Sequence, residues 1–161
     1  MQEQLRIDSQ MSRVNVKLFQ VAQPHMLGTG NPSDAWDFLY ATRHQPHLVQ
    51  VVHTGDVVHS IIYPDSGYVN NKMEVEIHTI LTETGVKRAK DQYRFFKAYL
   101  NLAFNTFGYK KVIVRAAENH KLIQKMALNV GFTLEGTHRK EYDGEQSVLY
   151  YGLFKEEFNN G

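Results

Sequence analysis

Three consecutive stretches between residues 47 and 82 constrain the fold of this chain more than any other feature. The sequence HLVQVVHTGDVVHSIIYPDSGY contains two runs rich in Val and Ile, separated by the letters TGD at residues 54–56, a pattern typical of a β-hairpin. The following sequence KMEVEIHTILT, at residues 72–82, alternates apolar with polar residues and predicts a third strand. Three strands in a row predict an antiparallel meander, so the fold is expected to be built on a sheet.

Three other stretches have the period of helices. After Gly85, apolar residues recur at steps of three and four until Gly108, namely Tyr93, Phe96, Leu100, Ala103 and Phe107. The sequence HKLIQKMALNV has the same period and ends before Gly131, which predicts a helix with a glycine cap. Residues 32–34, PSD, are favoured at the start of a helix and precede AWDFLYATRH.

The remaining patterned stretches predict strands. RVNVKLFQV, at residues 13–21, alternates apolar with polar residues, and KKVIVRAA, at residues 110–117, is a short apolar run. Residues 132–154 predict two strands around an Asp-Gly turn, whereas the polar residues 1–12 predict a loose terminal segment. The expected order is strand, helix, three strands, helix, strand, helix and two strands, an α+β fold with one mixed sheet.

Length and composition predict an ordinary globular protein. The 161 residues suit a single domain over residues 1–161, and 42% hydrophobic with 22% charged residues argues against a disordered chain. A formal net charge of +1 argues against a general nucleic-acid-binding surface, and cations such as Lys110, Lys111 and Arg115 are expected to form a solvated face. The absence of cysteine excludes disulfides, thiolate metal sites and a cysteine nucleophile. With no signal peptide or membrane-spanning stretch in the sequence, a cytoplasmic location and no membrane partner are expected.

The second half of the chain resembles the GNAT superfamily of acyl-coenzyme A-dependent N-acetyltransferases, especially the branch that modifies ribosomal proteins. The resemblance rests on Asn119, on the sequence NVGFTLEG at residues 129–136, and on the charged hairpin and apolar strand that follow. With the preceding strand and helix it extends over residues 73–158. It implies a GNAT-like single domain with a central mixed, mostly antiparallel sheet flanked by helices, in which the fourth and fifth strands splay apart.

The resemblance also implies acetyl-coenzyme A as cofactor. The backbone facing the pantetheine would come from the end of the fourth strand, at Ile80, Leu81 and Thr82. The loop that receives the pyrophosphate in the family normally contains glycines, whose amides approach phosphate closely. Here that loop falls on a glycine-free run, Lys87, Arg88, Ala89, Lys90, Asp91 and Gln92. Either the three cations replace the amides as pyrophosphate ligands, or they mark a lost cofactor site of the kind associated with bacteriophage proteins.

Acetyl transfer to an amine needs a base, which the family often places on the fourth strand. Glu74, Glu76 and His78 share one face of that strand, and Glu76 is the preferred candidate, followed by His78. The alternative is that this face is charged because it lies in water.

The usual acid of the family, a Tyr on the following helix, has no equivalent here. Its position falls on Met126 or Ala127, and the alternative donors from the last strands are Tyr142, Tyr150 and Tyr151. Asn119 is expected to contact the cofactor or to cap the helix, with His120 as an alternative at that place.

Of the eight histidines, His44 and His47 lie close together, but no further ligand has a recognisable spacing, so no metal site is predicted. The predicted function is transfer of an acetyl group to a primary amine of a small molecule or protein by direct attack. The alternative is a catalytically inactive GNAT-fold binding or structural protein, such as a phage or virion component. The aromatic sequence YRFFKAYLNLAF exceeds one apolar stripe and suggests a homo-oligomer or a larger assembly. Nucleic acid is not expected as a partner.

Overall fold

The chain forms two compact units that share one strand. Unit 1 comprises Met1–Gly67 and Thr79–Tyr99, and unit 2 comprises Tyr68–His78 and Leu100–Gly161. The shared strand is β4, Glu74–Leu81. The computed structural model describes residues 4–8, 13–26, 32–43, 48–55, 57–69, 74–140 and 144–161.

The strands of unit 1 confirm the predicted hairpin and add a strand before it. β2 (Val49–Thr54) and β3 (Val57–Val69) pair antiparallel, and the chain turns between them at Gly55, whose φ is 58°. β1 (Gln4–Asp8) pairs antiparallel with β2. The expectation of a loose terminus over residues 1–12 is therefore wrong for these five residues. Their sequence QLRID does alternate polar with apolar residues, but five residues are too few for this alternation to predict a strand.

The predicted strand at residues 13–21 is a helix. α1 spans Arg13–Ala22 and continues into a short 3-10 turn, η1 (Gln23–His25). The alternation of Val14, Val16 and Leu18 suggested a strand, but the side chains that enter the core are Leu18, Phe19 and Ala22. Steps of one, three and four place these three on one side of a helix, so burial of a helical stripe outweighed the two-residue pattern.

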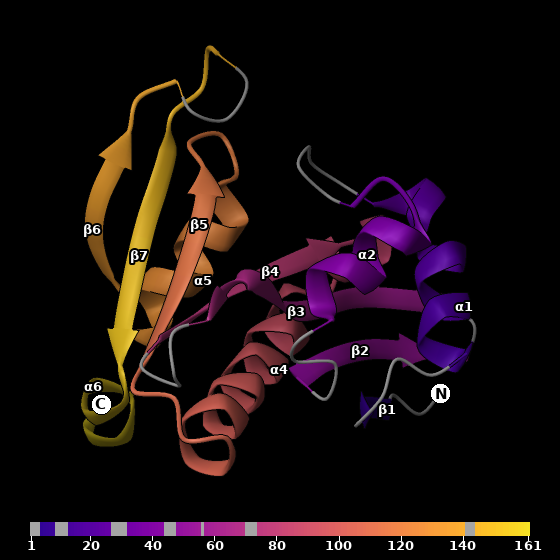
Figure 1. Cartoon of the computed structure of the whole chain (residues 1–161), viewed down its shortest axis with the longest axis horizontal. Helices are drawn as coiled ribbons and strands as arrows, with labels where there is room; N and C mark the ends of the chain where they lie inside the picture. Colours follow the sequence, from indigo (N-terminus) through magenta and orange to yellow (C-terminus); the bar gives the residue numbers. More distant parts are fainter. Residues whose placement is uncertain are drawn as a thin grey trace. The chain divides into compact units, whose positions relative to one another are not determined.

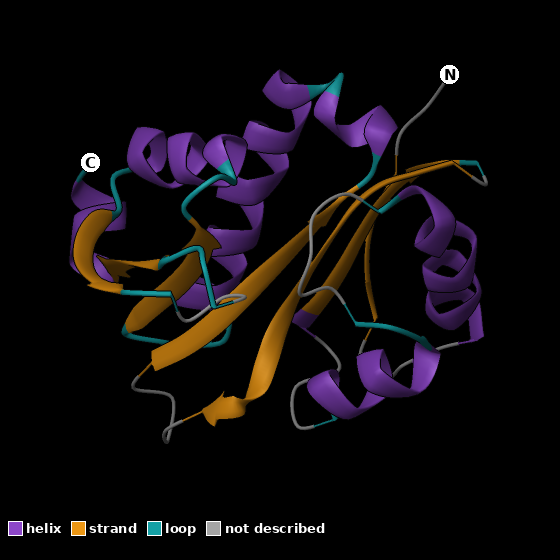
Figure 2. Cartoon of the chain, turned by 90° about the horizontal axis from the view of Figure 1, so that it is seen from above, coloured by secondary structure: helices purple, strands orange, loops and turns teal. Residues whose placement is uncertain are grey.

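Aromatic side chains join α1, α2 and β3 within unit 1. α2 spans Ala35–Thr42, and Asp34 caps its start by accepting a hydrogen bond from the Asp37 amide, as the residues before it predicted. Phe38 stacks on Phe19 with ring centroids 4.6 Å apart and meets Tyr63 edge-on at 5.4 Å. Figure 2 shows helices on both sides of the strands in this unit. The other helices here are α3 (Glu83–Val86) and the greater part of α4 (Ala89–Asn101).

Unit 2 is built on a mixed sheet. β5 (Lys111–Ala117) pairs parallel with β4 and antiparallel with β7 (Val148–Phe154), which in turn pairs antiparallel with β6 (Thr133–His138). Figure 1 shows β7 between β5 and β6. The strand order is β1-β2-β3-β4-β5-β7-β6, so the expected mixed, mostly antiparallel sheet flanked by helices is confirmed.

Helical segments complete unit 2. α4 continues into one π-helical turn, η3 (Leu102–Thr106), and the chain ends in α6 (Lys155–Asn160), which the sequence did not predict. α5 (Lys121–Val130) contacts β5 and ends at Gly131, whose φ of 117° confirms the predicted glycine cap. In the part of the chain that the structure describes, no helix has the length and apolarity needed to cross a bilayer.

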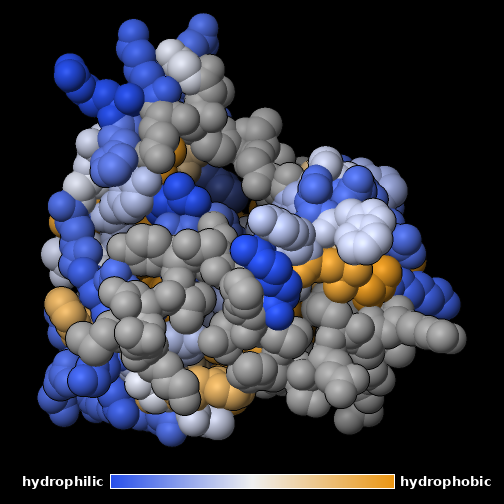
Figure 3. All heavy atoms as spheres, viewed as in Figure 1, coloured by the Kyte–Doolittle hydropathy of each residue, from blue (hydrophilic) through white to orange (hydrophobic). Residues whose placement is uncertain are grey.

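Two details of the sheet bear on function. The ladder between β4 and β5 ends at the pair Ile77 and Val114, although both strands continue, in agreement with the expected splay. At the other end of the order, β6 is exposed along almost its whole length. Hydrophilic side chains cover this edge of unit 2, over β6 and α6 (Figure 3). Charged residues on an edge strand discourage pairing with other chains.

Candidate functional site

A carboxylate with two partners lies at the last rungs of the β4–β5 ladder, within unit 2. The Glu76 side chain is only 7% exposed, and its Oε2 lies 2.8 Å from Nε2 of His78. Its Oε1 lies 2.8 Å from Nε of Arg115 on β5. This second contact is an ion pair between the Arg115 guanidinium and the carboxylate. Both carboxylate oxygens are therefore engaged.

The strand geometry explains why these three side chains meet. Glu76 and His78 are two residues apart on β4 and share one face of it. Glu76 stands opposite Ile113, and Arg115 follows two residues later on the same face of β5. The interpretation of this face as charged only because it lies in water is therefore wrong at Glu76, which is buried. Arg115, expected on a solvated face, is likewise a partner in this cluster.

The contacts of Glu76 and His78 indicate which of the two side chains can accept a proton from a substrate. A carboxylate accepts hydrogen bonds, so the neutral His78 ring carries its hydrogen on Nε2 and its lone pair on Nδ1. Both oxygens of the Glu76 carboxylate already contact a partner, so a proton arriving from an amine would have to displace one of these contacts. The arrangement suits a histidine base oriented by a carboxylate.

A second group of predicted residues lies in unit 1, at the end of β4. Ile80, Leu81 and Thr82 are all buried. Thr82 caps α3: its hydroxyl accepts from the Gly85 amide and donates to the Val58 carbonyl at 2.6 Å. Its own amide donates to the His59 carbonyl at 3.2 Å, so this amide is already used within the chain.

The predicted pyrophosphate loop is a helical turn in the structure. The amides of Lys87 and Arg88 donate to carbonyls within the turn, at Glu83 and Gly85. Arg88 turns its guanidinium to Asp91, with Nε at 3.0 Å and Nη2 at 2.8 Å from Oδ2. Ala89 and Lys90 begin α4, where the first amides of a helix lack intrahelical acceptors.

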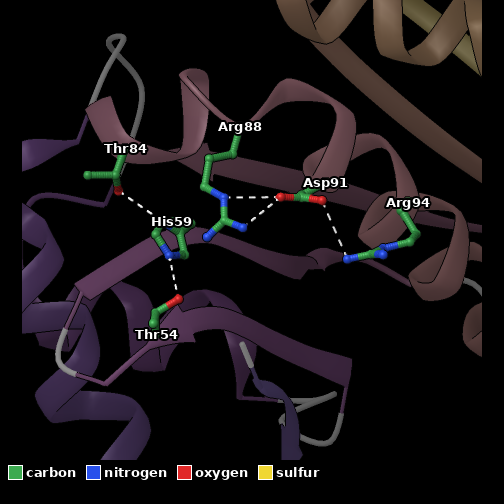
Figure 4. A network of polar contacts seen from close by, with 6 residues as sticks. All are labelled: Thr54, His59, Thr84, Arg88, Asp91 and Arg94. Atoms are coloured by element: carbon green, nitrogen blue, oxygen red, sulfur yellow. Dashed lines mark hydrogen bonds and ion pairs between the residues drawn. The ribbon is translucent and has the colours of Figure 1, made fainter. Parts of the chain in front are cut away.

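The three cations therefore differ in their surroundings. Arg94 also approaches Asp91, at 3.5 Å, so this carboxylate lies between two guanidinium groups (Figure 4). Lys87 and Lys90 are exposed, and neither forms an ion pair with any residue that the structure describes. Of the predicted cationic ligands, the two lysines remain available to an anion in this conformation.

His59 anchors the same turn to β3. Its Nε2 lies 2.9 Å from the Thr54 hydroxyl and its Nδ1 3.0 Å from the Thr84 hydroxyl, as Figure 4 shows. Burial lowers the pKa of His59 below its ordinary 6.5, opposed by the charge of Asp91 and reinforced by His53. His59 is thus a neutral structural link. The sequence did not mark it, because both partners are remote or uncharged.

The turn between β5 and α5 places Asn119 differently from the expectation. The N-cap position is held by His120, and no hydrogen bond of the Asn119 side chain to a described residue is present. Gln124 instead ties the turn, with its amide donating to the carbonyls of Ala117 and Glu118 at 2.9 Å each. Burial lowers the pKa of His120. A capping role for Asn119 is therefore wrong, and cofactor contact remains a prediction.

Of the three tyrosines that were candidates for the general acid, Tyr150 and Tyr151 differ in their surroundings. Tyr150 stands opposite Arg115 in the β5–β7 ladder, with the guanidinium carbon 5.9 Å from its ring centroid. Tyr151 is buried, and burial raises its pKa. Tyr142 lies outside the described residues, as do His44 and His47.

The structure thus brings the predicted residues together in two groups. Glu76 and His78 meet in unit 2, and residues 80–90 gather around the α3 turn in unit 1. Arg115 is the functional candidate that the sequence reasoning missed. Its signal was a cation inside the apolar run VIVRAA, at residues 112–117, and its partner Glu76 lies 39 residues away in the sequence.

No family model matches this sequence, and no curated protein matches it. Solved structures do match over nearly the whole chain. A chimera of spermidine N-acetyltransferase SpeG from Vibrio cholerae and hSSAT has a TM-score of 0.77 at 13% identity, covering 100% of both chains. SpeG from Vibrio cholerae, a spermidine/spermine N-acetyltransferase, was also solved with manganese ions; it has a TM-score of 0.72 at 15% identity, covering 99% of this chain and 96% of its own.

A third match has a different acceptor in its name. A protein assigned as a phosphinothricin N-acetyltransferase has a TM-score of 0.71 at 15% identity, covering 96% of this chain and 99% of its own. Identities this low establish the arrangement of the backbone, not the reaction. The chain therefore has the GNAT fold of the N-acetyltransferases, as the resemblance in its sequence implied.

Proposed function

We propose that this chain transfers the acetyl group of acetyl-coenzyme A to a primary amine of a small molecule or a protein. The observation that carries the proposal is the His78–Glu76 pair, which lies where the β4–β5 ladder ends. It lies in a fold that this chain shares with solved N-acetyltransferases. A partly exposed imidazole whose tautomer is set by a carboxylate can accept a proton from an amine.

The residues around the α3 turn fit a diphosphate through side chains. Lys87 and Lys90 are exposed next to the start of α4, where the helix dipole adds positive potential. Lysine binds phosphate as a point charge, so glycine is not required for this contact. Ile80 and Leu81 would face the pantetheine with their backbone, whereas the Thr82 amide is already bonded to His59.

Bound acetyl-coenzyme A supplies an activated thioester. The acceptor amine attacks the carbonyl carbon directly, because the chain has no cysteine to form an acyl intermediate. A C–N bond would form as the C–S bond breaks, the electron pair of the C–S bond would leave with coenzyme A as its thiolate, and His78 Nδ1 would take the proton that the amine loses. Glu76 holds the ring and stabilises the imidazolium that results, as a carboxylate does beside a catalytic histidine.

The test is an assay of thiol release from acetyl-coenzyme A with a panel of amines. Spermidine belongs in the panel because spermidine N-acetyltransferases share this fold. The wild-type protein is expected to release thiol with at least one amine, and His78→Gln to lower kcat/KM by about 10²- to 10⁴-fold. The matched control is His25→Gln, at an exposed histidine, which is expected to leave the rate unchanged. Equal rates for the two variants would remove His78 as base.

A second candidate function is a GNAT-fold binding or structural protein without catalysis. Two observations favour it: Arg88 is held by Asp91, and the turn amides of Lys87 and Arg88 are used internally. Acetyl-coenzyme A that binds without any thiol release, across the whole amine panel, would support this candidate over the enzyme.

A further inference from the structure

We infer that Arg115 is a positioning residue that fixes the Glu76 carboxylate and, through it, the His78 ring. The role of Arg115 in catalysis rests on the proposed acetyl transfer. Its effect on the proton affinity of His78 can be measured without any substrate. Arg115 contacts the Glu76 carboxylate directly, at 2.8 Å. It acts through Glu76.

Glu76 is buried, and its charge therefore needs a compensating neighbour. A carboxylate that is 7% exposed needs compensation, because removal from water disfavours its charge. His78 contacts one oxygen and Arg115 the other, each at 2.8 Å. A neutral histidine supplies a hydrogen bond but no charge. Arg115 is therefore the group that offsets the charge of Glu76.

Arg115 is itself held in place by the neighbouring side chain of Tyr150. Tyr150 is its direct neighbour on β7, and a side-chain hydrogen bond joins the two residues. His138 on β6 packs against Tyr150, with ring centroids 4.1 Å apart. A continuous line of side chains thus crosses the four strands of unit 2, from β4 to β6. Among the residues that the structure describes, the same strands also carry Glu74, Lys111 and Glu135, of which Lys111 and Glu135 pair with each other at 2.8 Å.

The consequence concerns the proton on His78. With Arg115 present, Glu76 and Arg115 together contribute little net charge near the imidazole. Without Arg115, the uncompensated carboxylate favours imidazolium, so His78 holds its proton to higher pH and acts as a base only above that higher pH. The ring also loses its fixed acceptor, because a carboxylate with one partner is free to rotate.

The experiment follows the histidine proton resonances of the full chain by NMR across pH, with His78→Gln used to assign the His78 signal. Arg115→Gln is expected to raise the pH midpoint of His78 by on the order of one unit. Arg115→Lys, which keeps the charge, is expected to recover at least half of this shift. The matched control is Lys111→Gln, which removes a cation on the same face that pairs with Glu135 instead of Glu76.

The kinetic readout is the acidic limb of kcat/KM against pH. Arg115→Gln is expected to move this limb upward by the same amount as the NMR midpoint. If that variant does not fold, Tyr150→Phe removes only the hydroxyl that holds Arg115 and is expected to give a smaller shift in the same direction. An unchanged His78 midpoint in the folded Arg115→Gln or Tyr150→Phe protein would overturn the inference. A shifted midpoint in a protein that acetylates no amine would contradict the proposed function and leave the positioning role standing.

Discussion

Among the glycines whose surroundings the structure describes, Gly85 is the one where an added methyl group should destabilise the fold most. It lies buried in α3, and a Cβ built there would come within 1.9 Å of the His59 carbonyl oxygen and 2.8 Å of its carbon. Both atoms belong to the backbone of β3, so no side-chain rotation can relieve the contact. Gly85→Ala therefore forces α3 away from β3 by roughly 1.5 Å before the contact becomes ordinary.

The expected change in the free energy of unfolding combines one stabilising and two destabilising contributions. Alanine in place of a helical glycine favours folding by about 1 kcal/mol. Overpacking costs about 1–3 kcal/mol, and more when backbone must move. Separation of α3 from β3 also stretches the hydrogen bonds that Thr82 gives to the His59 and Val58 carbonyls, each contributing about 1 kcal/mol. The expected net loss is about 2–4 kcal/mol in the free energy of unfolding.

Urea denaturation followed by circular dichroism measures this loss. The matched control is Gly136→Ala in β6, where an added Cβ meets nothing within 4 Å, and it should change the free energy of unfolding by less than about 0.5 kcal/mol. Equal stability of the Gly85→Ala and wild-type proteins would refute the close approach of α3 and β3.

Three further predictions concern unit 1. Phe38→Ala should lower the free energy of unfolding by about 3–5 kcal/mol in urea, whereas Tyr40→Ala, at a ring that is 67% exposed, should cost less than about 1 kcal/mol. Because the pKa of His59 is lowered below 6.5, the unfolded chain binds the proton more readily, so stability should fall as pH drops through 6.5 and level off below the folded pKa. His59→Asn should flatten that fall in pH-dependent urea titrations, and an unaltered slope would exclude His59 as a contributor. Asp91→Asn should release Arg88 and tighten coenzyme A binding several-fold in calorimetry; weaker binding would show that Asp91 supports the site instead of competing in it.

The elements with strong local signals were predictable from the sequence. Thr54 and Gly55 predicted the hairpin, and Gly131 predicted the end of α5. The helical spacing of Phe96 and Leu100 predicted α4. Each of these signals depends on backbone conformation or on one buried face, and both are local properties.

The errors arose where two periods fit the same residues. Around α1, Leu18 belongs both to an alternating series and to a helical stripe, and only the burial of Phe19 beside it separates the two. In β1, Leu5 and Ile7 gave a pattern too short to distinguish from a polar terminus. A partner strand decided the second case, and sequence periodicity carries no information about partners.

The candidate site was predictable only in part, for the same reason. The face shared by Glu76 and His78 follows from alternation along β4. The burial of Glu76 depends on Arg115, which β5 brings to it from far along the chain. Likewise, the sequence placed Arg88 at the expected loop. Only the folded helical turn shows that Arg88 forms an ion pair with Asp91.

Calorimetric titration of acetyl-coenzyme A into the wild-type chain tests the central claim most directly. We expect a dissociation constant in the micromolar range, about −6 to −8 kcal/mol of binding free energy. Neutralising Lys87 and Lys90 together should weaken binding at least tenfold and reduce its dependence on salt, whereas Lys121→Gln on α5 should change neither. Absent or millimolar binding by the wild-type chain would contradict the claim that this fold serves an acetyltransferase here.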